Sequence, residues 1–177
     1  MVGVNVRVNN KMQKGYTYKL VKPRGDLSDL IGFEPELSPL EMISYGIMGG
    51  KYFSDVVFDF EYPKEIRDLI KEKSAGIPSV PKRELNYFGV LVDDNRSKWV
   101  RSNLIFPEDP RGWIEWYLRT WLGRRSSHDK VMVNRWILMK RRLSLLSPIE
   151  NPEDRRVTNV RRRQDLLEWA FDTVNNH

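Results

Sequence analysis

The sequence contains no cysteine and only two histidines, His128 and His177. Without cysteine, the chain can form no disulfide and offers no thiolate as a nucleophile or as a metal ligand. With so little histidine, we expect no histidine-based metal cluster, and a Ser-His-Asp triad would depend on His128. The sequence therefore predicts no metal site, and it contains no catalytic motif that we recognise.

Long apolar segments are absent too. No run of about 18 apolar residues occurs, so we expect no transmembrane helix and no membrane partner. The first ten residues, MVGVNVRVNN, lack the apolar stretch of a signal peptide. Together with the absence of cysteine, this favours an intracellular protein, cytoplasmic or nuclear, that is not secreted.

The charge is unbalanced towards basic residues. The 177 residues include 30 Lys or Arg and 24 Asp or Glu, which gives a net charge of +6 and an isoelectric point of about 9.5. Hydrophobic residues at 40% and charged residues at 31% are typical of a soluble globular chain. The positive balance favours partners with phosphate or other anionic groups, although solubility alone would also explain it.

The segment 107–125, PEDPRGWIEWYLRTWLGRR, holds three of the six tryptophans and four arginines. Asp109 followed by Pro110 predicts a helix N-cap and first turn, and Gly123 predicts the helix end. On a helical wheel, only Arg111, Gly112, Glu115 and Arg119 form a polar face. Because the rest of the circumference is apolar, we expect a central helix over 110–122 that is buried on several sides.

The remaining chain is predicted to surround this helix. Alternation of valines in 2–8 and of apolar residues in 16–20 predicts a β-hairpin. Helical spacing predicts helices at about 39–48, 63–73, 127–143 and 160–174, and the apolar segment 85–92 is β-prone. The fold class is therefore α+β and mainly α-helical, with a helical core around the Trp-rich helix and a small N-terminal hairpin. Because the breaker cluster 22–26 follows the hairpin, we expect a dispensable appendage at 1–30 and a helical main domain at 31–177.

The charged face of the central helix is the main candidate site. Arg111, Glu115 and Arg119 follow the spacing i, i+4, i+8, and Arg124 and Arg125 come directly after the helix. Since arginine presents a planar fork that matches phosphate, these residues predict a cleft that grips phosphate and is oriented by Glu115. The alternative is a ladder of internal ion pairs.

Further candidates lie elsewhere in the chain. Arg161, Arg162 and Arg163 begin the last helix, where positive charge opposes the helix dipole, which favours an anionic partner. Lys51 follows two glycines that could cradle an anion, although a simple helix stop is the alternative. The candidates for stacking on a base are Trp113, Trp116 and Tyr117, which could instead be core residues.

Several segments together resemble one family. They are Leu37–Met42, Gly49–Tyr52, Asn86–Val90, Asp109–Trp113 with Trp116-Tyr117, Gly123–Arg125, Arg135-Trp136, and Arg163-Gln164 with Leu166-Leu167 and Trp169-Ala170. This pattern, with its DPRGWxxWYxRxxxGRR motif, resembles a family of uncharacterised proteins found in bacteria, plants, fungi and large DNA viruses. The resemblance covers roughly residues 37–173. Because the family has no established activity known to us, the resemblance implies no catalytic residues.

The function expected from these features is nucleic-acid binding, to DNA or RNA, by a protein that could also process the strand. One alternative is a non-catalytic interaction or structural subunit whose basic face docks on an acidic protein. A second is an enzyme for a phosphorylated or carboxylated small molecule. No cofactor is evident, but nuclease-like chemistry would need Mg²⁺ held by a pair of carboxylates. The available carboxylates are Asp55, Asp94, Asp109, Glu115 and Asp172.

Overall fold

The computed structural model describes residues 1–56, 59–76, 80–92 and 96–177. The helices are α1 (Pro39–Tyr45), α2 (Lys64–Lys73), α3 (Arg96–Arg101), α4 (Trp113–Leu122), α5 (Asp129–Lys140) and α6 (Val160–Leu167). Short 3-10 helices are η1 (Met48–Gly50), η3 (Arg83–Leu85), η4 (Arg141–Leu145) and η5 (Pro152–Arg156). Strands β1 (Asn5–Arg7) and β2 (Thr17–Lys19) pair antiparallel, with Val6 opposite Tyr18. The predicted α+β, mainly helical class with an N-terminal hairpin is confirmed.

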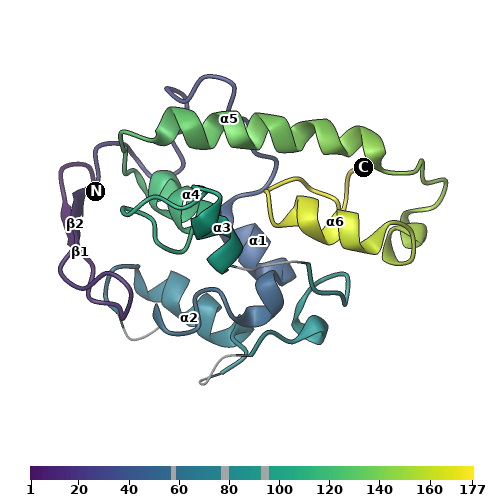
Figure 1. Cartoon of the computed structure of the whole chain (residues 1–177), viewed down its shortest axis with the longest axis horizontal. Helices are drawn as coiled ribbons and strands as arrows, with labels where there is room; N and C mark the ends of the chain where they lie inside the picture. The colour runs from purple at the N-terminus through teal and green to yellow at the C-terminus, as the bar shows by residue number, and fades with distance from the viewer. Residues whose placement is uncertain (57–58, 77–79, 93–95) are drawn as a thin grey trace.

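The elements are arranged around α4 (Figure 1). Helix α5 runs along one edge of the molecule, α2 lies at the opposite edge, and the hairpin and the η4–η5 region form the two ends. All residues of α4 are buried except the half-buried Trp121. The Trp113 indole donates to the Glu168 carbonyl at 2.8 Å, and the Trp116 indole donates to Asp129 at 2.8 Å. These bonds join the central helix to α5 and to the end of α6.

The start of α4 differs from the prediction. The helix begins at Trp113, its N-cap is Gly112 with φ 95°, and no side chain caps it. Asp109, the expected N-cap, instead turns its carboxylate to arginines in the interior. The Arg111 backbone N–H donates to Glu115 at 3.1 Å. A side chain of the first helical turn thus satisfies a donor of the entering chain.

Other boundaries also shift. The capping box of Ser38 and Glu41 is present as predicted, but α1 ends before Gly46, which has φ 101°. Helix α6 ends near Leu167 rather than at 174, because Ala170 adopts φ 65° and turns the chain. Segment 85–92 forms no strand: after η3 it runs as turns and irregular chain.

The hairpin belongs to the same hydrophobic core as the helices. Val8, Tyr18 and Leu20 are buried members of that core. The carbonyl of Gly123, at the end of α4, accepts hydrogen bonds from the Val21 and Lys22 backbone N–H groups at 2.8 and 3.0 Å. A Cβ at Gly123 would lie 2.1 Å from the Lys22 carbonyl oxygen, so only glycine permits this approach. The boundary predicted near residue 30 does not divide the core.

This attachment gives a stability prediction. Leu20→Ala should lower the free energy of unfolding by about 2–5 kcal/mol, because it removes a buried side chain that joins the hairpin to the helical core. Val4→Ala, at a position 40% exposed just before β1, should change it by less than about 0.5 kcal/mol. Urea denaturation measures both. If both variants changed the free energy of unfolding by the same small amount, the hairpin would be the dispensable appendage expected from the sequence.

Candidate functional site

A buried network of ion pairs lies at the centre of the molecule, around Arg119. Its Nε is 2.6 Å from Glu61 Oε1, and its Nη1 is 3.1 Å from Asp109 Oδ1 and 3.6 Å from Glu115 Oε1. The Arg119 side chain has no exposed surface. Helix α4 therefore supplies the charged groups Glu115 and Arg119, and segments far from it in sequence supply their partners.

The network extends in two directions from this centre. Asp109 also binds Arg124 Nη2 at 2.5 Å and His128 Nε2 at 2.8 Å. On the other side, Arg111 binds Asp55 at 2.9 Å and Glu115 at 3.2 Å. Every carboxylate of this group thus has a cationic partner, which is the condition for burying charge at a tolerable cost.

The arginine face predicted to grip phosphate is therefore an internal ion-pair ladder, which was the alternative. Arg111, Arg119 and Arg124 are 7%, 0% and 1% exposed. A phosphate could reach them only by displacing carboxylates from the core. Arg125 is half-buried and pairs with Asp29 at 2.7 Å. Because these guanidinium groups already have protein partners, the geometry gives them a structural role.

The other predicted phosphate contacts divide into exposed and buried residues. Lys51, Arg161 and Arg162 are exposed. Arg163 is fully buried and donates to the Thr158 carbonyl at 2.9 Å and to the His177 carbonyl. Of the basic run at the start of α6, only the first two residues can therefore meet a ligand.

Hydrogen bonds and close packing within the protein account for the two glycines before Lys51. The Gly49 N–H donates to the Asn86 side chain at 2.7 Å, and the Gly50 N–H donates to the Ile47 carbonyl at 3.1 Å. A Cβ at Gly50 would lie 2.5 Å from the Lys73 carbonyl oxygen. The backbone donors that we expected to cradle an anion are thus already used within the protein.

The carboxylates proposed for Mg²⁺ are dispersed or already paired. Asp55, Asp109 and Glu115 bind arginines, and Asp172 accepts from the Asn175 N–H at 3.0 Å. Asp94 lies outside the described residues. Within the described ranges, no group of three or more acidic or histidine side chains is arranged to hold a metal ion.

Burial perturbs the ionisation of this network unequally. Desolvation raises the pKa of Glu115 to about 7, against the opposing charges of Arg119 and Arg111. Burial also opposes ionisation of Asp109, but the hydrogen bond from His128 and the charge of Arg124 outweigh it and lower the pKa. Two carboxylates in one cluster thus differ in affinity for a proton.

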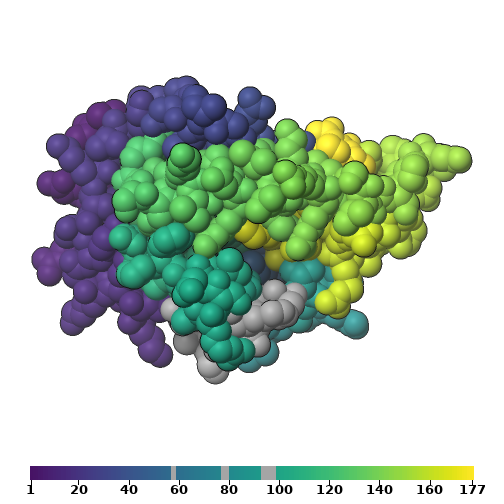
Figure 2. Space-filling view, turned by 45° about the horizontal axis from the view of Figure 1, so that its top comes forward, coloured from purple at the N-terminus to yellow at the C-terminus, as the bar shows by residue number. Residues whose placement is uncertain are grey.

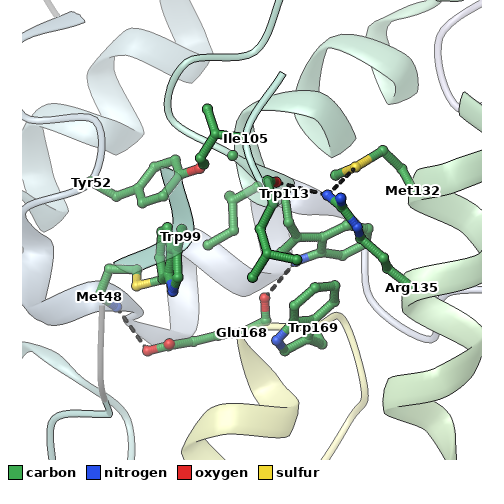
Figure 3. A pocket seen from close by; sticks show the side chains of 12 residues that line it. Met48, Tyr52, Trp99, Ile105, Trp113, Met132, Arg135, Glu168 and Trp169 are labelled. Carbon is green, nitrogen blue, oxygen red and sulfur yellow. Dashed lines mark hydrogen bonds between the residues drawn. The ribbon is translucent and has the colours of Figure 1, made fainter. Parts of the chain in front are cut away.

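A separate pocket opens beside the start of α4 (Figure 3). It is lined mainly by aromatic and apolar side chains, with one arginine and one glutamate in its wall. Its defining members are Tyr52, Trp99, Trp113, Arg135, Glu168 and Trp169, and we call it the tryptophan pocket. The space-filling surface is hollowed between α5 and the region around α3 (Figure 2). A concave, mainly apolar site with a few polar groups in its wall is the kind of site that takes up a small organic ligand.

Only some of these rings are available to a ligand. Trp113 is stacked on Tyr117 at 5.2 Å and on Trp169 at 4.8 Å between ring centroids. Trp116 and Tyr117 are 0% and 1% exposed, so all three predicted stacking residues belong to the core. Trp99 and Trp169, which were not predicted as site residues, are half-buried and line the opening.

The polar groups of the pocket wall are held in place by the protein. Arg135 donates to the Leu104 and Asn103 carbonyls at 2.7 and 2.9 Å. The Glu168 carboxylate accepts from the Met48 N–H at 2.9 Å and from Gln164 at 3.0 Å. The wall is therefore rigidly built, and its chemistry is mainly that of flat aromatic surfaces.

Comparison with known proteins adds no assignment. No protein-family model, curated protein or solved structure matches this chain. The resemblance described above therefore stays a prediction. Among the described residues, no helix is long and apolar enough to cross a bilayer.

The raised pKa of Glu115 predicts a pH-dependent stability. The folded pKa of about 7 exceeds the ordinary value of 4.5, so the folded state binds this proton more tightly. The resulting stabilisation is complete below pH about 4.5 and is lost as the pH rises to about 7. Relative to Glu115→Gln, which cannot titrate, the wild type should lose on the order of 3 kcal/mol over this range. Urea unfolding of both proteins at pH 4.5 and 8 measures this difference.

Groups other than Glu115 titrate in both the wild type and Glu115→Gln. Only the difference between their free energies of unfolding therefore reports on this carboxyl. A difference that is the same at the two pH values would mean that Arg111 and Arg119 keep Glu115 ionised throughout.

Proposed function

We propose that this protein binds nucleic acid through a basic surface at the C-terminal end of α5. This surface consists of Lys140, Arg141, Arg142, Arg156, Arg161 and Arg162, all exposed. The Arg162 side chain donates to the Leu145 carbonyl at 2.7 Å, and Arg142 pairs with Asp165 at 3.0 Å. These contacts hold η4 against α6, and the segments that carry the six basic residues, from the end of α5 to the start of α6, lie at one end of the molecule (Figure 1).

The observation that carries the proposal is the distribution of charge between interior and surface. Among the described residues, the buried basic side chains are Arg111, Arg119, Arg124 and Arg163. The buried acidic side chains are Asp59, Glu61, Asp109, Glu115, Asp129, Glu168 and Asp172. The buried acidic side chains outnumber the buried basic ones, even when Glu115, whose pKa is raised, is left out. The buried arginines therefore do not account for the net positive charge of the chain. This charge lies on the surface, where it favours contact with polyanions.

The chemistry of the basic surface supports the same partner. Five of its six members are arginines, whose planar guanidinium binds phosphate in a bidentate manner. Arg161 and Arg162 stand at the start of α6, and the first turn of this helix has no acidic residue to offset them. Since positive charge there opposes the helix dipole, local helix stability gives no reason for these residues.

An acidic protein would be attracted to the same surface and is the competing partner. A small phosphorylated molecule is the second competitor. Salt dependence separates a strand from a small molecule, because release of many counterions occurs only when several phosphates are bound together.

The test uses fluorescence anisotropy with a labelled short single-stranded oligonucleotide at several salt concentrations. Affinity should fall steeply as salt rises. The double variant Arg141→Gln, Arg161→Gln should weaken binding and lower the slope of log K against log salt by about one for each phosphate that the variant no longer neutralises. The matched control is Lys11→Gln, Lys14→Gln, which removes the same charge from the exposed hairpin loop and should leave the slope unchanged.

Two results would contradict the proposal. Failure to bind single- or double-stranded DNA or RNA at low salt would leave the acidic protein partner as the better hypothesis. Equal reductions of affinity in the two double variants would show attraction by total charge, without a binding surface.

A further inference from the structure

We infer that the tryptophan pocket binds one unstacked base of the nucleic acid. This inference rests on the proposed function, and it adds a specific site and a chemical group that occupies it. The pocket offers about 80 Å³ to the centres of water-sized spheres, and it is partly open to solvent. Since about 10–15 Å³ on this measure holds one water, the pocket has room for several waters, which is the space of one flat ring and not of a stacked run of bases.

The arrangement of the rings indicates a flat ligand. Trp99 stands on one side of the pocket, and Trp113 and Trp169 lie on the other (Figure 3). Because Trp113 is already stacked on Tyr117 and Trp169, the rings left for a ligand are the half-buried Trp99 and Trp169, which line the pocket. Every base has a π face, so stacking on such surfaces holds a base with little regard to its identity.

The glycine at the end of the pocket keeps it open. Gly112 has φ 95°, and a Cβ there would lie 3.0 Å from Ile105 Cδ1, 3.7 Å from the Tyr52 hydroxyl and 3.8 Å from the Trp99 ring. A side chain at this position would intrude between the aromatic residues. The conformation that starts α4 thus also leaves room beside Trp99.

The pocket is connected to the basic surface by two helices. Helix α5 carries Arg135 in the pocket wall and Arg141 just beyond its end, a separation of roughly 9 Å at the helical rise of 1.5 Å per residue. Helix α6 carries Arg161 at its start and is followed by Trp169 in the pocket. Since nucleotides in a strand are spaced by about 3.4 Å or more, a few nucleotides reach from one to the other. One base can therefore enter the pocket while neighbouring phosphates lie on the arginines.

The polar groups of the pocket predict weak selectivity among bases. Arg135 is engaged with the Leu104 and Asn103 carbonyls, and most of the remaining wall is apolar. Because the polar groups of the described wall are few and already bonded within the protein, stacking is the main source of binding. We expect the four bases to bind with affinities within a few-fold of one another.

The experiment compares two labelled strands of equal length, an oligothymidylate and a fully abasic deoxyribose-phosphate strand. Both have the same number of phosphates, so they differ in the contribution of the bases alone. The wild type should bind the oligothymidylate roughly tenfold or more tightly, as the effect of losing one stacked base predicts. Trp99→Ala should remove this preference, Trp99→Phe should keep part of it, and the salt slope should stay the same in both.

Trp121→Ala is the matched control, because Trp121 is also half-buried but packs against Arg24, outside the pocket. It should keep the full preference for bases. Thermal melts confirm that each variant is folded, and the Phe variant remains informative if the Ala variant is not.

The outcomes separate this inference from the proposed function. If neither strand binds, the proposed function fails. If both strands bind equally, nucleic-acid binding stands and the base site is overturned. A preference for bases that survives in Trp99→Ala, or disappears in Trp121→Ala, overturns the assignment to this pocket.

Discussion

The structure depends on the burial of Arg119 among three carboxylates. Glu61, Asp109 and Glu115 surround its guanidinium within 3.6 Å, in a part of the core without solvent exposure. Charges in such a place are tolerated only as a paired set, and removal of one partner typically costs about 3–5 kcal/mol. The network therefore fixes the relative positions of α4, the chain entering it and the segment around Glu61.

This constraint also shapes the two surfaces with functional interest. Asp109 turns inward to Arg119 and Arg124, so α4 starts later than predicted, at Trp113, and the chain before it passes beside the tryptophan pocket. In the part of the chain that the structure describes, more carboxylates than arginines are buried. The arginines at the end of α5 and the start of α6 stay outside this network and are exposed.

Local features were predictable from the sequence because their cause lies within a few residues. The apolar circumference of 113–122, the alternation in the hairpin and the capping box of Ser38 and Glu41 follow from spacing along one element. Helix ends were less accurate. Gly46 and Ala170 turn the chain where tertiary hydrogen bonds and packing require it, earlier than the periodicity indicated.

The sequence by itself determined that α4 is central and that Arg111, Glu115 and Arg119 share one face. Only the tertiary structure decided that this face points inward, because its partners Asp55 and Glu61 lie 56 and 58 residues away. The tryptophan pocket is likewise formed by segments that are distant in sequence: its walls come from η1, α3, α4, α5 and the end of α6. Periodicity records which residues of one element lie together, whereas charge pairing between distant segments determines what they face.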